Sequence, residues 1–179
     1  FQLHRVQKQN LRPAMQGLRE VLLDTRAACG DDARGVMCSV NPRLSKIHAE
    51  VYALAKRTSD HRVPQSGAYE EIWYGEEREA SDTPQEPFYG RTYMPRKFKI
   101  GFVVPPSNDI DVYSQDLGFI AIVEDGKLQG FDVAVGGGMG RTDQAPQTYP
   151  RLADVIGFIE VDRLQETVDA VMGVQRDYG

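Results

Sequence analysis

The strongest candidate for chemistry in this sequence is a run of cationic side chains between residues 91 and 99. These side chains are Arg91, Arg96, Lys97 and Lys99, with no Asp or Glu among them, although the chain has a net charge of −5. Residues 97–104 alternate between polar and apolar side chains, which predicts a strand with both lysines on one face. Their ammonium groups repel each other unless water or an anion lies between them. Two interpretations follow: a solvated strand face, or an anion-binding floor with a hydrophobic underside.

The three histidines give a weaker signal. His48 and His61 fall within a predicted helix, where a structural role is the simpler interpretation. On a strand, His4 would share a face with Gln2, and this pair is suited to hydrogen-bonding a bound ligand. No HxxxH or HExxH spacing is present, so the sequence predicts no zinc site and no metal ligands.

A glycine-rich run follows the central strands. Its glycines are Gly136, Gly137, Gly138 and Gly140. A dinucleotide-binding loop opens directly into a helix, whereas here Pro146 and Pro150 intervene before the next helical pattern. The run is therefore interpreted as a tight turn whose backbone lies against something flat or bulky.

The elements that must position these residues indicate an α+β fold, with a mixed β-sheet and helices packed on it. Strands are predicted for residues 1–6, 36–40, 69–74, 97–104, 117–123 and 127–135, the last two joined in a hairpin by Asp125-Gly126. Helices are predicted from Asn10 with Leu11, Met15, Leu18 and Leu22 on one face, after Asn41-Pro42 as far as Pro64, near residues 152–156, and finally with Leu164, Val168, Val171 and Val174 on one face. The acid-rich residues 75–87 are expected to form a solvated loop.

Length and composition fit a single soluble domain over residues 1–179. The chain is 41% hydrophobic and 26% charged, which is close to the globular average, and its acidic balance argues against a nucleic-acid partner. No apolar run approaches the roughly 20 residues of a membrane span. Cys29 and Cys38 match no common metal spacing and are expected to be structural thiols. Because the chain starts at Phe1 without an initiator Met, we expect it to be a fragment. A fragment that lacks a neighbouring strand would leave a strand edge exposed, and self-association is one way to cover that edge.

Several motifs together resemble the siroheme-binding part of assimilatory sulfite and nitrite reductases. The most specific are Tyr93-Met-Pro-Arg-Lys-Phe-Lys-Ile-Gly101 and Val135-Gly-Gly-Gly-Met-Gly-Arg141. Others follow in the same order as in the family: Phe1-Gln-Leu-His4, Arg34-Gly-Val-Met-Cys38, Asn41-Pro42, Pro64-Gln-Ser-Gly67, Ile72-Trp73, Pro105-Pro106, Asn108-Asp109-Ile-Asp111 and Gln175-Arg176-Asp177. The resemblance covers the whole chain and is stronger to the sulfite-reducing branch of the family.

The resemblance implies a nitrite/sulfite reductase 4Fe-4S-domain-like fold and a cytoplasmic oxidoreductase. Such an enzyme reduces sulfite to sulfide, or nitrite to ammonia, at a siroheme coupled to a 4Fe-4S cluster. By resemblance, Arg34, Lys97 and Lys99 bind the anion and support protonation of its oxygens. The residues that the resemblance places at the siroheme are Gln2, His4, Arg34, Arg96, Lys97, Lys99, Gly136, Gly137 and Gly138. Siroheme carries carboxylates and sulfite is an oxyanion, so ligand charge would offset the repulsion between the lysines.

Parts of the family pattern are absent from these 179 residues. The family binds its cluster through two cysteine pairs and completes its anion pocket with an upstream arginine-rich strand, and the chain contains neither. We therefore expect an incomplete half-site, inactive by itself, whose partners are the rest of its own polypeptide and an electron donor, either a flavoprotein subunit or ferredoxin. The alternatives are a siroheme-dependent nitrite reductase, a non-catalytic anion- or tetrapyrrole-binding module, and a nucleotide-binding domain built on the glycine run.

Overall fold

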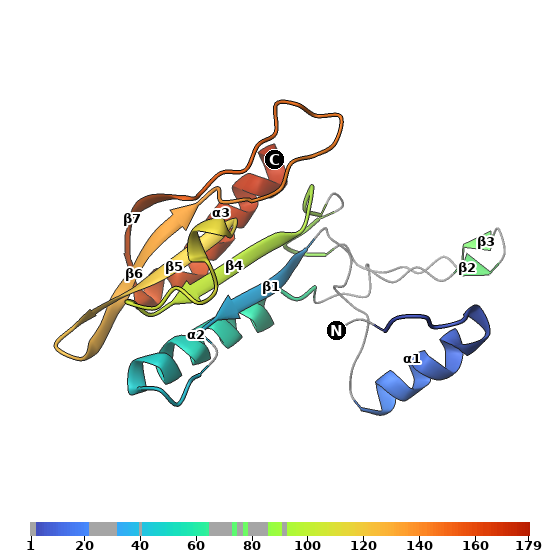
Figure 1. Ribbon diagram of the computed structural model, residues 1–179, viewed down its shortest axis with the longest axis horizontal. Coiled ribbons are helices and arrows are strands. Elements are labelled where there is room, and N and C mark those ends of the chain that lie inside the picture. Colours follow the sequence, from blue (N-terminus) through green and yellow to red (C-terminus); the bar gives the residue numbers. More distant parts are fainter. Residues whose placement is uncertain are drawn as a thin grey trace.

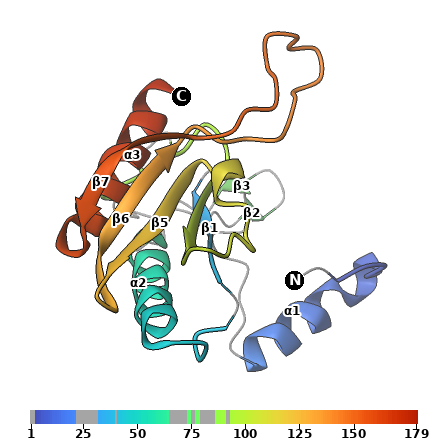
Figure 2. The same ribbon diagram turned by 60° about the vertical axis from the view of Figure 1, so that its left-hand side comes forward.

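The computed structural model describes residues 3–21, 32–39, 41–64, 73–74, 77–78, 86–90 and 93–179. It confirms the predicted α+β class, because a five-stranded mixed sheet carries two helices on one face (Figures 1 and 2). In spatial order the strands of the sheet are β1 (Ala33–Cys38), β4 (Phe98–Val103), β5 (Leu117–Glu124), β6 (Lys127–Val135) and β7 (Asp154–Glu160). The two helices are α2 (Lys46–Arg62) and α3 (Leu164–Tyr178).

The sheet changes direction in its middle. β1, β4 and β5 are parallel, and α2 makes the crossover from β1 to β4. β5, β6 and β7 are antiparallel neighbours. Asp125 and Gly126 join β5 to β6 with φ values of 50° and 70°, the left-handed conformation that a tight hairpin turn needs. The predicted hairpin is thus confirmed. The predicted alternation of buried and exposed residues at the start of β4 is confirmed as well.

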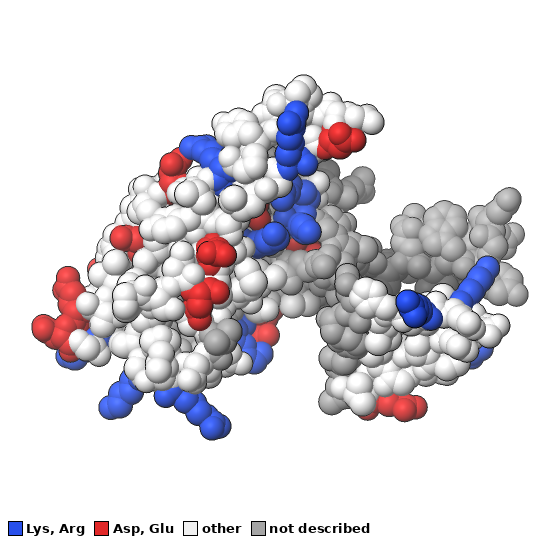
Figure 3. Space-filling model, in the orientation of Figure 1, with Lys and Arg blue, Asp and Glu red and all other residues white. Residues whose placement is uncertain are grey.

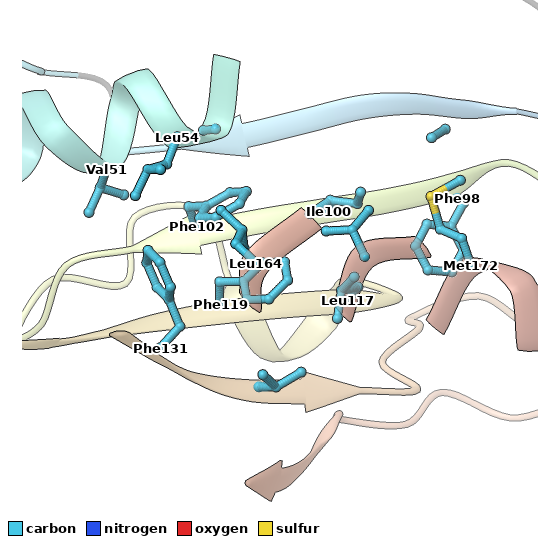
Figure 4. Close-up of a cluster of buried hydrophobic side chains, with 14 of the residues drawn as sticks. Val51, Leu54, Phe98, Ile100, Phe102, Leu117, Phe119, Phe131, Leu164 and Met172 are labelled. Atoms are coloured by element: carbon cyan, nitrogen blue, oxygen red, sulfur yellow. The ribbon is translucent and has the colours of Figure 1, made fainter. Parts of the chain in front are cut away.

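The core lies between the sheet and the two helices (Figure 4). Alternate residues of each strand face this side, and the rings of Phe102, Phe119 and Phe131 meet there with centroids 4.8–5.7 Å apart. α2 contributes the buried Val51 and Leu54. The core residues of α3 are Leu164, Val168 and Met172. Val174, expected on the inner face of α3, is 61% exposed, because the buried stripe follows Met172 instead.

The outer face of the sheet is covered by the connection between β4 and β5, which contains the 3-10 helix η3 (Val112–Ser114). A Cβ on Gly101 would lie 2.6 Å from Ile110 Cδ1, and one on Gly118 would lie 2.7 Å from Val112 Cγ2. Two glycines in neighbouring strands therefore let this connection lie directly on the sheet.

The N-terminal segment differs from its prediction. Leu3–Gln7 is exposed and irregular, and it leads into the 3-10 helix η1 (Lys8–Asn10) and then α1 (Leu11–Glu20). The helix is confirmed, but the strand predicted for residues 1–6 is wrong where it is described, since no neighbouring strand pairs with it in the described ranges. Of the strand predicted for residues 69–74, the structure describes only β2 (Trp73–Tyr74). Of the acid-rich residues 75–87 it describes only β3 (Glu77–Arg78) and residues 86–87, and the expectation of a solvated loop is wrong at Glu86, which is 3% exposed. No helix in these parts has the length and apolar character needed to cross a membrane.

The helix predicted near residues 152–156 is also wrong, because these residues lead into and begin β7. A ladder to β6 sets Phe158 opposite Asp132 and Ile159 opposite Phe131. Directly after these residues, Gly157 has a φ of 153°, so no helix continues past residue 156. The apolar residues here form too short a run for periodicity to distinguish a helix from a strand, and the pairing with β6 decides the outcome.

Candidate functional site

The lysines of the basic run stand at the beginning of β4. Lys97 and Lys99 are exposed, whereas Phe98 is 3% exposed and Ile100 is fully buried beneath them. The rise of an extended chain separates the Cα atoms of the two lysines by about 7 Å. The predicted arrangement, with both lysines on one side of a hydrophobic strand, is confirmed.

Arg34 belongs to the neighbouring strand. The ladder between β1 and β4 pairs Ala33 with Phe98 and Gly35 with Lys99, with a register irregularity at Arg34 itself. The backbone of Arg34 is therefore adjacent to that of Lys99. Its side chain lies outside the described part of the structure, so the role assigned to Arg34 stays a prediction.

Buried contacts at the end of α2 hold the start of β1. The Tyr89 hydroxyl donates a hydrogen bond to the Arg62 carbonyl oxygen at 2.5 Å and accepts one from the Ala33 N–H at 3.1 Å. Arg62 in turn reaches α3, with Nη2 2.8 Å from an Asp169 carboxylate oxygen. Burial raises the pKa of Tyr89 to about 12, so its hydroxyl remains a donor at neutral pH. Ala33, the residue before Arg34, is thus connected through Tyr89 and Arg62 to both α2 and α3.

Asp116 connects the start of β4 to the glycine turn. Its Oδ2 accepts a hydrogen bond from the Lys99 N–H at 2.9 Å, and its carbonyl oxygen accepts one from the Gly136 N–H at 3.0 Å. The lysine strand and the glycine turn, separated by more than 30 residues in sequence, therefore lie side by side.

The three consecutive glycines have three different surroundings. Gly136 has a φ of 84°, a left-handed conformation that other residues adopt only with strain. A Cβ on Gly137 would lie 2.3 Å from the Tyr113 carbonyl oxygen, so this position admits no side chain. A Cβ on Gly138 would meet nothing within 4 Å. The expected tight turn is confirmed by the φ of Gly136, and the expected close approach of its backbone to other groups is confirmed at Gly137 alone, since a Cβ on Gly136 or on Gly138 would meet nothing within 4 Å.

A cavity of about 620 Å³ lies beside this turn. Its lining comes from the segment before β4, the glycine turn, the following loop and the end of α3: Arg96, Asp116, Gly136, Gly137, Gly138, Gly140, Arg141, Thr142, Gln147, Thr148, Tyr149, Arg151 and Gln175. The loop closes on itself, because Gly138 and Arg151 exchange backbone hydrogen bonds of 2.8 and 2.7 Å. The structure thus brings Arg96 together with Gly136, Gly137 and Gly138, which the sequence predicted as parts of one site.

The cavity is cationic. Three arginines and one carboxylate line it, and Figure 3 shows Lys and Arg side chains gathered over the start of β4 and the segment that follows β6. Arg151 forms an ion pair with Asp154, which leaves Arg96 and Arg141 as the lining cations with no ion pair among the described residues. The site prediction did not include Arg141, although it ends the glycine motif. Arg151 and Asp116 could not be inferred, since they join the site only through the folding of the chain.

Among the described residues, Lys97, Lys99 and His4 were predicted for the same site but do not line this cavity. His4 is exposed in the N-terminal segment and does not line it, and Gln2 lies outside the described residues. Cys38 is a half-buried thiol near Asp109, and burial followed by that negative charge raises its pKa, which disfavours the reactive thiolate. Cys29 lies outside the described residues.

The two cofactors of the family fit these residues differently. A 4Fe-4S cluster requires four cysteine ligands, and the sequence contains two cysteines, so this chain does not supply the ligand set. Among the described residues no group of His, Cys, Asp and Glu could hold a metal ion. The cavity does fit a large polyanion such as siroheme, since it offers arginines and a glycine floor at Gly138 without a side chain.

Comparison with known proteins gives matches over the whole chain. The family model described as "Nitrite and sulphite reductase 4Fe-4S domain" matches residues 54–179. A protein of Nitrobacter hamburgensis named "Sulfite reductase (NADPH) hemoprotein beta-component" is 74% identical over all 179 residues, and proteins of the same name in Nitrosomonas europaea and Geobacillus kaustophilus are 68% and 57% identical over the whole chain. The chain spans about a third of the length of these relatives, 31–32%.

The fold is also found in a solved structure. The NirA protein of Mycobacterium tuberculosis superposes with a TM-score of 0.63 over 95% of this chain and 26% of its own, at 23% sequence identity. This likeness supports the α+β architecture described above.

Proposed function

The chain belongs to the family of nitrite and sulphite reductase 4Fe-4S domains, and we propose that it is the siroheme- and sulfite-binding half-site of an assimilatory sulfite reductase. One observation carries the proposal: the exposed Lys97 and Lys99 stand next to a cationic cavity formed by Arg96 and the glycine turn. A group of cations in a chain with a net charge of −5 is suited to an anionic ligand.

Lys97 and Lys99 would act on the substrate. The Cα atoms of the two lysines lie about 7 Å apart on one side of β4, so both flexible side chains could bring their ammonium groups to one small oxyanion, whose negative charge would offset the repulsion between them. Each sulfite oxygen leaves as water and therefore needs protons, and an ammonium group that touches the oxygen is a suitable donor. Arg34, one residue from the partner of Lys99 on β1, would complete the set as a cation that stays charged.

Arg96, Gly136, Gly137 and Gly138 would act on the cofactor. The guanidinium of Arg96 would bind a carboxylate, and the open side of Gly138 would admit the edge of the macrocycle. When bound, siroheme would supply the iron at which sulfite is reduced, with electrons from a 4Fe-4S cluster held elsewhere in the protein. Gln2 and His4 remain proposed siroheme contacts.

The substrate and partners follow from the relatives. Their name specifies sulfite, which favours sulfite over nitrite, and NADPH, which favours a flavoprotein subunit over ferredoxin as the electron donor. We place the enzyme in the cytoplasm and expect the isolated 179-residue chain to be inactive. The alternative of a non-catalytic anion-binding module would keep the same cations without turnover.

The test uses the full-length protein with Lys97→Met and Lys99→Met, and Lys127→Met as a matched control in the β5–β6 hairpin. Sulfite affinity is read from the change in the siroheme absorption spectrum, and activity is measured separately. We expect each site variant to bind siroheme normally but to lose at least about tenfold in sulfite affinity or turnover, the equivalent of one ion contact. Unchanged sulfite binding and turnover in both variants would refute the assignment, and so would equal losses in Lys127→Met.

A further inference from the structure

Exposed apolar side chains are concentrated in the edge strand of the sheet and in the residues just before it. Within ten residues, Tyr149, Leu152, Val155, Ile156 and Phe158 are between 49% and 67% exposed. We call these five residues the 149–158 strip. The last three belong to β7, which is the final strand in the sheet order and has no partner on its outer side among the described strands. Exposed apolar side chains on a strand with an unpartnered edge are typical of an interaction site.

β7 is apolar on both of its faces. Val155 and Phe158 pair with Ala134 and Asp132, so they point to the outer face of the sheet. The Phe158 ring lies against Gly130, where a Cβ would come within 2.7 Å of its Cζ. Ile156 has no direct partner, because it falls at a register irregularity, and it lines a cavity of about 310 Å³ with Val171 and Val174 of α3.

Apart from the register irregularity at Ile156, β7 shows little of the usual protection against pairing among the described residues. Natural edge strands carry Lys, Pro or a covering element, whereas β7 reads Asp-Val-Ile-Gly-Phe-Ile-Glu, with its charges confined to the two ends. An added strand would find backbone groups along β7 that pair with no described strand, and apolar side chains above and below them.

We infer that a β-strand from the same polypeptide, contributed by sequence outside residues 1–179, pairs with β7 and covers Val155, Ile156 and Phe158, the part of the 149–158 strip that β7 contributes. The relatives are about three times as long as this chain, so they carry ample sequence to supply it. Covalent connection makes such a segment a far more effective competitor for the edge than a separate molecule.

A second copy of the chain fits the edge less well. A symmetrical antiparallel pair centred on Gly157 would set Asp154 of each copy opposite Glu160 of the other. Two pairs of like charges directly opposite each other disfavour that ladder. A strand of different sequence carries no such constraint.

Hydrogen exchange in the full-length protein tests the inference. We expect those amides of residues 154–160 that point away from β6 to exchange at least about a hundredfold more slowly than in a free peptide, at a rate that does not change on dilution. Ile156→Lys should accelerate this exchange at least about tenfold, whereas Leu44→Lys, a control residue that is 66% exposed before α2, should not. A photoreactive phenylalanine analogue in place of Phe158 should cross-link to a segment outside residues 1–179 of the same molecule.

Two results would overturn the inference. Fast exchange at β7 together with no cross-link would show that the edge is open. Protection that disappears on dilution, with cross-links between two copies of residues 149–158, would show that a second copy covers the edge. If Ile156→Lys fails to fold, the cross-link and the dilution series in the otherwise unaltered protein still decide between these outcomes.

Discussion

Replacing Gly137 with alanine should damage the fold of the glycine turn, whereas the same change one residue later should not. A Cβ on Gly137 would lie 2.3 Å from the Tyr113 carbonyl oxygen and 2.5 Å from the Gln115 carbonyl oxygen. Both obstacles are backbone atoms, and the Gly137 N–H also donates a hydrogen bond to the Gln115 oxygen at 3.1 Å. The turn can accept a methyl group only by moving away from η3.

The cost can be estimated by comparing the three glycines. Overpacking of this kind costs about 1–3 kcal/mol, and the Gly137 change should fall at the upper end because no side chain can rotate out of the way. Gly136→Ala places alanine in a left-handed conformation for about 1–2 kcal/mol, partly offset by about 0.4–1 kcal/mol of lost unfolded-state entropy. Gly138→Ala has free space and an ordinary φ, so its effect on stability should stay within about 0.5 kcal/mol.

Two assays on the full-length protein separate these effects. Urea denaturation followed by circular dichroism measures stability, and the absorption of bound siroheme measures cofactor content. We expect the order of destabilisation to be Gly137→Ala, then Gly136→Ala, then Gly138→Ala. We expect Gly138→Ala to lower siroheme content despite its normal stability, since the methyl group would occupy the space proposed for the macrocycle.

The reasoning fails if Gly137→Ala is as stable as the unaltered protein, because the contacts with Tyr113 and Gln115 would then not restrain the turn. A Gly138→Ala protein with full siroheme content and full activity would show that the open side of Gly138 is not part of the cofactor site.

Two further predictions concern the framework of the site. Phe98→Ala should lower the free energy of unfolding by about 3–5 kcal/mol in urea denaturation, because a buried ring beneath Lys97 and Lys99 is lost; a loss below about 1 kcal/mol would contradict its place in the core. Burial raises the pKa of Tyr89 from 10.0 to about 12, so its stabilising contribution is complete below pH 10 and declines as the pH rises from 10 to 12. Tyr89→Phe should flatten this part of the stability profile between pH 9 and 12, and an unchanged slope would show that another group titrates there.

The predictable parts of the fold are those that local chemistry determines. The β4 strand follows from alternation around Phe98 and Ile100, and the hairpin follows from Asp125-Gly126, whose left-handed residues match the twist of the flanking strands. β7 could not be predicted, because Val155, Ile156 and Phe158 are exposed and follow no face-specific pattern. Its existence depends on the long-range ladder to β6, which leaves no local signal in residues 154–160.

Only part of the site could be predicted from the sequence. Arg96 and the three glycines were identified by family resemblance, and the structure brings them to one cavity. Arg151 was beyond prediction because its place depends on the backbone bonds to Gly138. Asp116 was missed because a single acid before a strand is common, and only its bonds to Lys99 and Gly136 give it a role.

The paired bonds between Gly138 and Arg151 make the intervening loop a separable module. A loop whose two stems are clasped together can gain or lose residues at its tip without shifting the strands on either side. Residues 139–150 can therefore be replaced, in evolution or by design, to change the residues that line the cavity while β4 keeps its register.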